Sequence, residues 1–535
     1  MVSAVLFITF FVLLVLNVPI SVCLGLSSAA AILYSGTSLT IVATNIYSGI
    51  SKFLLLAIPF FVLSGNIMAK AGISTRLIRF VDTCVGHRKG GIANVCIIVA
   101  CFFGAISGSG PATVAALGAV LIPAMVERGG FSAAFSTALM ATSSSIAIVI
   151  PPSIAFVVYA SITGVSIGDM FMAGIIPGIL MGLALVVVVM LEVRRNHVVP
   201  SNVEKASAKE RWNAFKDAFW GFLMPVIILG GIYGGIFTPT EAAAVSVVYG
   251  LFVGMIIYKE VKFKDLWEIL IDSAKTTGGI MLIVACASLF SFVCTRFGIS
   301  TAASELLARV AGNQFTFLLI CNIIFLIAGC FIDANSAMYI FIPIMLPVCK
   351  ALGYNVIAFG IMATVNLAIG QVTPPVGVNL FVAIGIKLRD GIRVTLQEIS
   401  RAVVPMVAAS IVVLLIITYI PQISTCLPAA LGSAAAIENG ETAGGDSGTT
   451  QTDNDDFNTI GDYSDLDWAD MTWNFTCSTT ETSTWAQAGR KFGELMEQAT
   501  GGKVKVDVYA ADQLTGGNQS EGIQALMNGD PVQIS

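Results

Sequence analysis

Four short polar interruptions break the apolar segments of this chain, and they fall in two pairs about 220 residues apart. The first pair lies in GAISGSGPATVAALGAV from Gly104 and in TSSSIAIVIPPS from Thr142. The second pair lies in GCFIDANSAMYIFIPIM from Gly329 and in TVNLAIGQVTPPVGVN from Thr364. An unsatisfied backbone polar group costs several kcal/mol in hydrocarbon, so such breaks persist only where they line a buried site or a water cavity. Paired interruptions in two corresponding halves therefore indicate the binding site of a secondary transporter.

The interruptions are rich in oxygen ligands and contain no Lys or Arg. Helix N-termini created by the breaks favour anions, whereas freed carbonyls and helix C-termini suit Na⁺. We therefore expect an anionic substrate to be held by helix dipoles, hydroxyls and co-bound cations. The candidate substrate-binding side chains are Ser107, Ser145, Asn335, Ser336 and Asn366. Gln371 is a further polar residue of the second broken helix. Close helix packing through Gly and Ser is the alternative for any single cluster, but the repetition in both halves favours a site.

Asp333 is the one acid that we place at the tip of a membrane hairpin. Ionisable groups inside a membrane are functional suspects. The sequence leaves three roles open for Asp333: neutralising a cation, carrying a proton, or capping a helix N-terminus. Glu241 in Thr-Pro-Thr-Glu fits a capping arrangement with Thr238 or Thr240.

The composition identifies a polytopic membrane protein up to about residue 428. Hydrophobic residues make up 56% of the chain and charged residues 11%, against about 25% in soluble domains. The net charge of −5 divides into +8 for residues 1–427 and −13 for residues 428–535. Such asymmetry marks two regions with different surroundings.

Hydropathy predicts an all-helical membrane fold with continuous spans, two re-entrant hairpins and two broken helices. The continuous spans are expected near residues 3–17, 19–35, 52–69, 171–192, 218–237, 241–258, 276–295 and 402–420. The hairpins are expected at 91–127 and 314–349, and the broken helices at 131–164 and 355–386. Residues 71–90 and 298–313 precede the hairpins and are expected to form amphipathic interfacial helices or simple loops.

Basic residues orient this arrangement, because positively charged loops favour the cytoplasm. Of the 24 Lys and Arg residues before residue 428, 20 fall on one side of the predicted membrane. Both ends of the membrane part then face outward, and the two hairpins enter from opposite sides. Residues 1–217 and 218–428 are therefore predicted to be inverted repeats. This orientation places the basic loops in the cytoplasm.

At these motifs the chain resembles the large membrane subunit of tripartite ATP-independent periplasmic (TRAP) transporters. The matching strings are GAISGSGPATVAALG, IPPSI, TPTEAAAV and NLAIGQVTPPVGVNLF, within residues 1–428. The resemblance implies a Na⁺-coupled, elevator-type importer of organic acids such as four-carbon dicarboxylates. It also implies two protein partners, a small four-helix membrane subunit and a periplasmic substrate-binding protein. No cofactor other than the coupling Na⁺ is implied.

The resemblance also implies positions for two Na⁺ sites. Carried over, the first uses Ser107 and Ser109 with carbonyls near Ala147, Ile150 and Pro152. By the inverted repeat, the second uses the hairpin around Gly329 and Asp333. Its carbonyls would come from residues near Gly370, Thr373 and Pro375. One departure concerns the first Pro-Pro loop, where many members of the family have Gly and this chain has Ser-Ile-Ala at residues 145–147.

The tail is predicted to begin with a flexible acidic linker over residues 429–467. It continues with strands near Trp473–Phe475 and Val504–Tyr509 and helices near Thr484–Thr500 and Glu521–Asn528. This order is typical of the start of an α/β domain. Residues 468–535 resemble the first portion of a TRAP periplasmic binding protein. We expect a truncated or joined sequence, with the tail in the periplasm.

Other functions remain open at the sequence level. A stand-alone Na⁺/anion symporter or ion exchanger shares the inverted-repeat design, but it needs no binding-protein-like tail. A receptor or scaffold needs no symmetric broken helices. Intramembrane catalysis and ATP hydrolysis lack their motifs, because the chain has no His-Glu-x-x-His, no paired catalytic carboxylates and no Walker A sequence. The 11 Cys and two His form no metal-binding pattern. We expect contact with membrane lipid and none with nucleic acid.

Overall fold

The computed structural model describes residues 2–16, 18–195, 205–386, 394–431, 471–477, 484–500 and 503–510. The chain divides into two units, residues 1–442 and residues 443–535. In its described residues the first unit contains helices and turns but no strand. The second unit carries the described strands.

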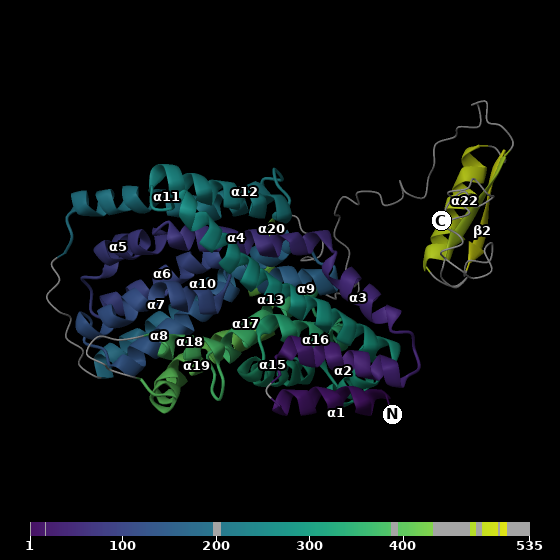
Figure 1. Ribbon diagram of the computed structural model, residues 1–535, viewed down its shortest axis with the longest axis horizontal. Coiled ribbons are helices and arrows are strands. Elements are labelled where there is room, and N and C mark those ends of the chain that lie inside the picture. The colour runs from purple at the N-terminus through teal and green to yellow at the C-terminus, as the bar shows by residue number, and fades with distance from the viewer. Residues whose placement is uncertain are drawn as a thin grey trace, which may run out of the picture. The chain divides into compact units, whose positions relative to one another are not determined.

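In its described residues, the first half of the membrane unit forms the α-helices α1 to α10 (Figure 1). They are α1 (Val2–Val15), α2 (Ile20–Tyr34), α3 (Thr40–Ile50), α4 (Ala57–Lys70), α5 (Ile73–Val85), α6 (Gly91–Ser107), α7 (Gly110–Glu127), α8 (Ala133–Ser145), α9 (Ile154–Thr163) and α10 (Ile167–Arg195). A 3₁₀ turn over Phe53–Leu56 leads into α4, and another over Ile146–Ile148 extends α8.

The second half, over the residues that the structure describes, forms the helices α11 to α20. They are α11 (Ala208–Tyr233), α12 (Pro239–Leu251), α13 (Phe263–Arg296), α14 (Ile299–Ala311), α15 (Gln314–Phe331), α16 (Ala334–Ala351), α17 (Val356–Gly370), α18 (Val378–Ile384), α19 (Leu396–Tyr419) and α20 (Gln422–Ala430). A π-helical turn over Phe252–Ile257 continues α12. Among the described residues of the whole chain, nine helical segments are long and apolar enough to cross a membrane. The chain is therefore a multi-pass integral membrane protein.

Both predicted hairpins and both predicted broken helices are confirmed. The helix pair α6–α7 breaks at Gly108–Ser109, and the pair α15–α16 breaks at Ile332–Asp333. In each pair the two helices pack against one another. The broken helices open over residues 149–153 and 371–377 and contain the Pro-Pro pairs, whose missing N–H groups cannot continue a helix.

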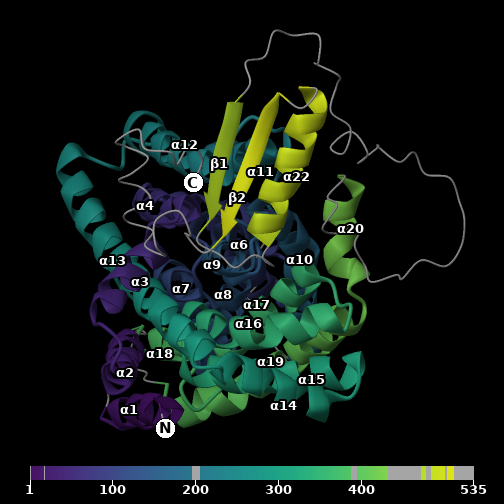
Figure 2. The ribbon, with the colours of Figure 1, turned by 90° about the vertical axis from the view of Figure 1, so that its right-hand side faces the viewer.

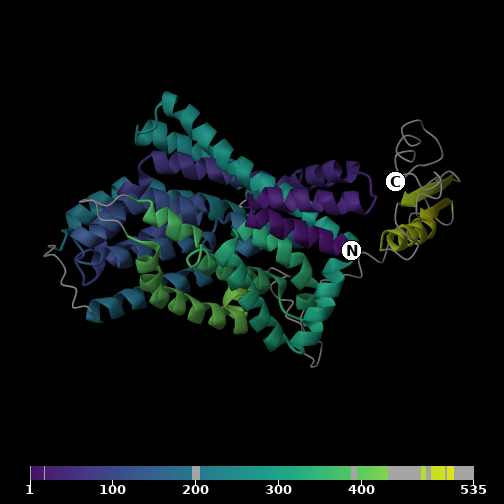
Figure 3. The same cartoon turned by 60° about the horizontal axis from the view of Figure 1, so that its bottom comes forward.

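The two halves interlock around these broken helices. Helix α8 packs against α18 and α19, and α9 packs against α16. Figure 3 accordingly shows green C-terminal helices beside blue helices of the first half. Every residue of α17 from Ile357 to Gly370 is buried, which explains why its sequence is apolar on all sides. We call the helices α6–α10 and α15–α19 the inner bundle.

A second group of helices flanks the inner bundle, and we call it the outer group. Helix α13 packs against α2, α3 and α4, while α12 packs against α4 and α11 packs against α5. Figures 1 and 2 show α13 running obliquely past the inner bundle. Ion pairs between Lys70 and Glu268 (3.0 Å) and between Arg76 and Glu260 (2.7 Å) tie parts of this group together.

Helices also form where the sequence analysis expects shorter segments or none. Helix α3 and helix α20 are not among the predicted spans, and α13 begins at Phe263, well before residue 276. Both segments that precede the hairpins are helical, α5 and α14, which confirms helices over simple loops. Each of these two helices follows a glycine with positive φ, Gly72 or Gly298.

The second unit has the predicted β-α-β order. Strands β1 (Met471–Cys477) and β2 (Val504–Ala510) pair in parallel, and α22 (Thr484–Ala499) connects and covers them (Figure 2). A parallel pair needs such a crossover helix. The predicted helix over 521–528 and the predicted linker from residue 432 onward lie outside the described residues, whereas residues 429–430 still belong to α20.

Candidate functional site

The tip of the first hairpin gathers oxygen atoms in a very small space. Gly108 turns the chain with φ +60°, and Ser109 is extended before α7 begins. The Ser107 hydroxyl lies 2.8 Å from the Thr113 hydroxyl, and the Thr113 hydroxyl donates to the Ser109 carbonyl at 2.8 Å. The Ser107 hydroxyl also lies 3.4 Å from that carbonyl. Three oxygens from uncharged groups thus converge, which is a donor set suited to an alkali cation.

This tip rests directly on the first broken helix. A Cβ atom added to Gly108 would lie 2.7 Å from the Pro152 carbonyl oxygen, and one added to Gly104 would lie 2.7 Å from the Cα of Ala147. The structure therefore brings Ser107, Ser109, Ala147 and Pro152 together. The side chain of Ile150 instead packs against Gly178 of α10, so Ile150 could contribute only backbone atoms.

The second half repeats the same contact with different residues. Gly329 of α15 meets Gly370 of α17, where a Cβ added to Gly370 would lie 2.5 Å from the Cα of Gly329. The N–H of Gly377 donates to the carbonyl of Cys330 at 3.3 Å, which ties the broken helix to the hairpin. The Thr373 hydroxyl donates to the Ile369 carbonyl at 2.8 Å. Gly329, Gly370 and Thr373 thus lie in the region where the inverted repeat predicts them, with Pro375 in the same loop.

Asp333 caps helix α16. Its Oδ2 accepts from the backbone N–H of Asn335 at 3.0 Å and from that of Ser336 at 3.2 Å. Its Oδ1 accepts from the Ser336 hydroxyl. The capping role, one of three that the sequence leaves open, is therefore present. Glu241 likewise forms the predicted capping box with Thr238, which confirms its structural role.

Asp333→Asn is expected to leave folding nearly unchanged, because Asn and Asp rank alike as N-caps. Asp333→Ala is expected to lower the free energy of unfolding by about 1 kcal/mol, through loss of the cap. Thermal unfolding of the two purified variants checks this difference. Substrate uptake by the Asn variant separates the roles: retained Na⁺-dependent uptake means that Asp333 is only a cap, and lost uptake in a folded protein means that its charge is needed.

The remaining candidate side chains occupy different settings. Ser145 donates to the Thr142 carbonyl at 2.8 Å within its own helix. Asn335 Oδ1 is buried without a hydrogen-bond partner. The next residue, Ser336, donates its N–H and its hydroxyl to Asp333. Asn366 donates to Asn322 Oδ1 at 2.7 Å, in a buried network with Thr418. Asn366 therefore joins α15, α17 and α19, and its contribution to a substrate site stays a prediction.

One contact between the halves is not predicted by the motifs. A Cβ added to Gly110, at the start of α7, would lie 2.8 Å from Asn379 Nδ2 and 3.0 Å from Gln371 Oε1. Both side chains are buried, and Asn379 Oδ1 and Gln371 Oε1 have no hydrogen-bond partner. The N-terminus of α7 thus faces unsatisfied amide oxygens from the other half. The signals in the sequence are Gln371 in the second polar break and an Asn inside the apolar run VNLFVAI.

A crevice of about 110 Å³ separates the first hairpin tip from the outer group. Ser107, Ser109 and Ala112 line its inner wall, and Asn66 of α4 and Thr276 of α13 line the opposite wall. Asn66 donates to Ser273 at 2.8 Å, which fixes its side chain. The crevice thus borders Ser107 and Ser109 of the candidate cation site at the boundary between the two helix groups.

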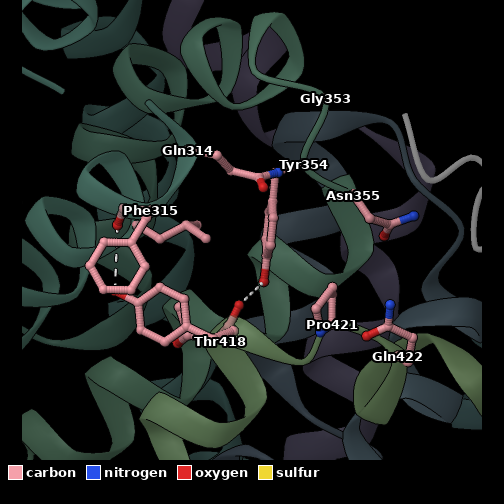
Figure 4. Close-up of a pocket in the computed structure, with 10 residues that line it drawn as sticks. Gln314, Phe315, Gly353, Tyr354, Asn355, Thr418, Pro421 and Gln422 are labelled. Atoms are coloured by element: carbon pink, nitrogen blue, oxygen red, sulfur yellow. Dashed lines mark hydrogen bonds between the residues drawn. The ribbon is translucent and has the colours of Figure 1, made fainter. Parts of the chain in front are cut away.

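A separate pocket of about 360 Å³ lies where α15 and α17 begin and α19 ends (Figure 4). The Tyr354 hydroxyl donates to the Thr418 carbonyl at 2.9 Å across it, and Phe315 stacks on Tyr419 with ring centroids 4.6 Å apart. None of the candidate site residues lines this pocket. Within the described part of the chain, no group of three His, Cys, Asp or Glu side chains could hold a metal ion.

Comparison with known proteins agrees with this architecture. The structure resembles the YdaH transporter of Alcanivorax borkumensis with a TM-score of 0.52, over 74% of this chain and 89% of that one. Their sequences are 14% identical, so the likeness concerns the fold alone.

Sequence relatives are much closer. The chain is 38% identical over 436 residues to the C4-dicarboxylate TRAP transporter large permease protein DctM of Rhodobacter capsulatus, covering 78% of this chain and 97% of that protein. It is 41% identical over 410 residues to the protein of the same name from Pseudomonas aeruginosa, covering 76% and 94%. The family description "Tripartite ATP-independent periplasmic transporter, DctM component" matches residues 7–423. The chain therefore belongs to the DctM family, the large permease components of TRAP transporters, and its relatives are named as permeases rather than enzymes.

Proposed function

We propose that this chain is the membrane subunit that carries organic acids inward together with Na⁺. Its relatives are named for C4-dicarboxylates, isethionate, 2,3-diketo-L-gulonate and sialic acid, which are all small organic acids. We propose a dicarboxylate-like substrate, because three of these relatives, 38%, 41% and 38% identical to this chain, are named for C4-dicarboxylates, whereas isethionate, 2,3-diketo-L-gulonate and sialic acid each occur in the name of one. A stand-alone symporter or exchanger is the alternative.

One observation carries the proposal. The Ser107 and Thr113 hydroxyls and the Ser109 carbonyl converge beside the Pro152 carbonyl, and no cationic side chain is among them. Carbonyls of unwound helix are suitable Na⁺ ligands, and helix N-termini attract the anionic groups of a substrate. A bound Na⁺ would supply the positive charge that the hairpin tip lacks, next to the N-terminus of α7.

Ser107→Ala is expected to raise the Na⁺ concentration that gives half-maximal uptake by about tenfold. Hydrogen bonds and similar contacts to charged groups contribute about 1.5–3 kcal/mol, and 1.4 kcal/mol corresponds to a factor of ten. Thr113→Val should act in the same direction, and Ser109→Ala more weakly, because Ser109 offers its carbonyl. Uptake into vesicles at varied Na⁺ measures the effect. Ser48→Ala on the exposed helix α3 is the control, and equal Na⁺ dependence in Ser107→Ala and Ser48→Ala would remove Ser107 from the site.

Three further proposals concern the setting of transport. We propose that the protein resides in the bacterial inner membrane and works with a small four-helix membrane subunit and a periplasmic binding protein. The tail after residue 428 would be periplasmic, because the predicted topology puts 20 of the 24 basic residues before it on the opposite side, where positive charge favours the cytoplasm. Alkaline phosphatase fused after Ser433 should be active in cells, and an inactive fusion would reverse this orientation.

The inner bundle is proposed to move as an elevator against the outer group. The hairpins and broken helices, within residues 91–164 and 314–386, form the core of the proposed moving part. Packing extends this assignment, because α10 contacts α6 and α17 while α19 contacts α8 and α17. Helices that contact both broken helices so closely should move with them.

A further inference from the structure

An apolar cavity of about 530 Å³ lies between α6, α10 and α11, away from the candidate cation site residues except Ile150. Its walls are built by hydrocarbon side chains, a thiol and backbone, and every lining residue is apolar. They include Ile97, Cys101, Val186, Phe222 and Leu229. Water needs two to four polar partners to occupy a cavity, and none of the lining side chains offers a strong one. The volume is that of a ligand pocket, about 300–1,000 Å³.

The cavity lies at hydrocarbon depth on two membrane-spanning helices. Helix α10 lines it between Ile175 and Val186, and helix α11 between Phe222 and Leu229. With a rise of about 1.5 Å per residue, Glu192 comes about 9 Å after Val186, and Asp217 comes about 7 Å before Phe222. The charged ends of both helices are thus outside the cavity.

The mouth of the cavity faces lipid. Ile179, Leu183 and Val226 are 51%, 55% and 62% exposed, and all three line the opening. In a multi-pass membrane protein, large apolar side chains exposed at this depth face the acyl chains of the bilayer. The cavity is therefore continuous with the hydrocarbon, and an occupant reaches it from the side.

We propose that one acyl chain of a bilayer phospholipid occupies this cavity. The proposal rests on the membrane location and the cavity walls, and it does not depend on Na⁺ coupling. Two features connect it with function. Helices α6 and α10 belong to the inner bundle and α11 belongs to the outer group. The acyl chain would therefore lie between the two helix groups that are proposed to move against each other. Ile150 and Pro151 line the cavity, directly before Pro152 of the broken helix, whose carbonyl lies against the hairpin tip.

The test uses two adjacent valines of α10. Val186 lines the cavity, whereas Val187 is 51% exposed and lies outside it. The full chain, with and without its small membrane subunit, is extracted in mild detergent from vesicles of phosphatidylethanolamine and phosphatidylglycerol. Native mass spectrometry then counts retained phospholipids. We expect wild type and Val187→Trp to retain one phospholipid that Val186→Trp loses.

Leu229→Trp fills the cavity from α11 and should also lose that phospholipid, which keeps the test decisive if Val186→Trp fails to fold. Three results would overturn the proposal. One is a phospholipid retained equally by all folded variants, which places it elsewhere. Another is a detergent molecule, or nothing, in wild type. The third is a phospholipid that binds only when the small membrane subunit is removed, because that subunit would then cover the cavity.

Discussion

Gly370→Val is expected to abolish uptake and to prevent stable folding. A Cβ at this position would lie 2.5 Å from both the Cα and the carbonyl carbon of Gly329, closer than real Cβ contacts occur. Helix α17 is buried on every side, so it has no free direction in which to move. Overpacking a well-packed core typically costs about 1–3 kcal/mol, and contact with backbone should place this variant at the upper end. Ala147 occupies the corresponding position in the first half, in contact with Gly104, so the repeat accommodates a methyl group there. Valine is therefore chosen as the larger substitution.

Thermal unfolding and gel filtration of the purified variants measure the effect. Gly230→Ala in α11 is the matched control, because a Cβ there meets nothing within 4 Å. That control should be as stable as wild type or more stable by about 1 kcal/mol, since Ala is the better helix former. A Gly370→Val protein as stable as Gly230→Ala would mean that α15 and α17 do not meet at these glycines.

A crosslink across the crevice is expected to stop transport. Ala112 on α7 and Thr276 on α13 line opposite walls, one on the inner bundle and the other on the outer group. In a background without the native cysteines, Cys at both positions would be joined by a short cleavable reagent. If the inner bundle moves against the outer group, the bridge holds it in one position, and cleavage of the bridge restores uptake.

The control for this crosslink joins two helices of the outer group. Lys70 on α4 and Glu268 on α13 form a 3.0 Å ion pair, so Cys at both positions can be bridged without linking the moving part. Uptake should survive that bridge. Full uptake by the bridged 112–276 variant would contradict the elevator movement, although membership of the family would stand.

The hairpins and broken helices could be predicted because they interrupt apolar runs with Gly, Ser, Asn and Pro. In a membrane such interruptions are too costly to be accidental. The early turns of α13 were missed because Lys264, Asp265 and Glu268 lower the hydropathy there, although these turns are helical. Helix α3 was missed for a related reason, since it is only 11 residues long and contains Thr, Asn and Ser.

Only those contacts of the site that recur in both halves could be predicted from the sequence. The contacts of Gly104 with Ala147 and of Gly329 with Gly370 follow the same pattern in each half. The approach of Asn379 and Gln371 to Gly110 joins segments more than 250 residues apart, and no periodicity in the sequence encodes it. Asn366 stays a predicted ligand: its Nδ2 donates to Asn322 Oδ1 in a network with Thr418, whereas its own Oδ1 is buried without a hydrogen-bond partner.

The central claim is that a Na⁺ gradient drives the uptake of an organic acid through this chain. The direct measurement uses sealed vesicles that contain the full chain and its small membrane subunit, with binding protein and radiolabelled C4-dicarboxylate outside and no ATP. The account predicts accumulation above the external concentration when Na⁺ is higher outside, and collapse of that accumulation when choline replaces Na⁺ or an ionophore dissipates the gradient. Equal uptake with choline and with Na⁺ would contradict it.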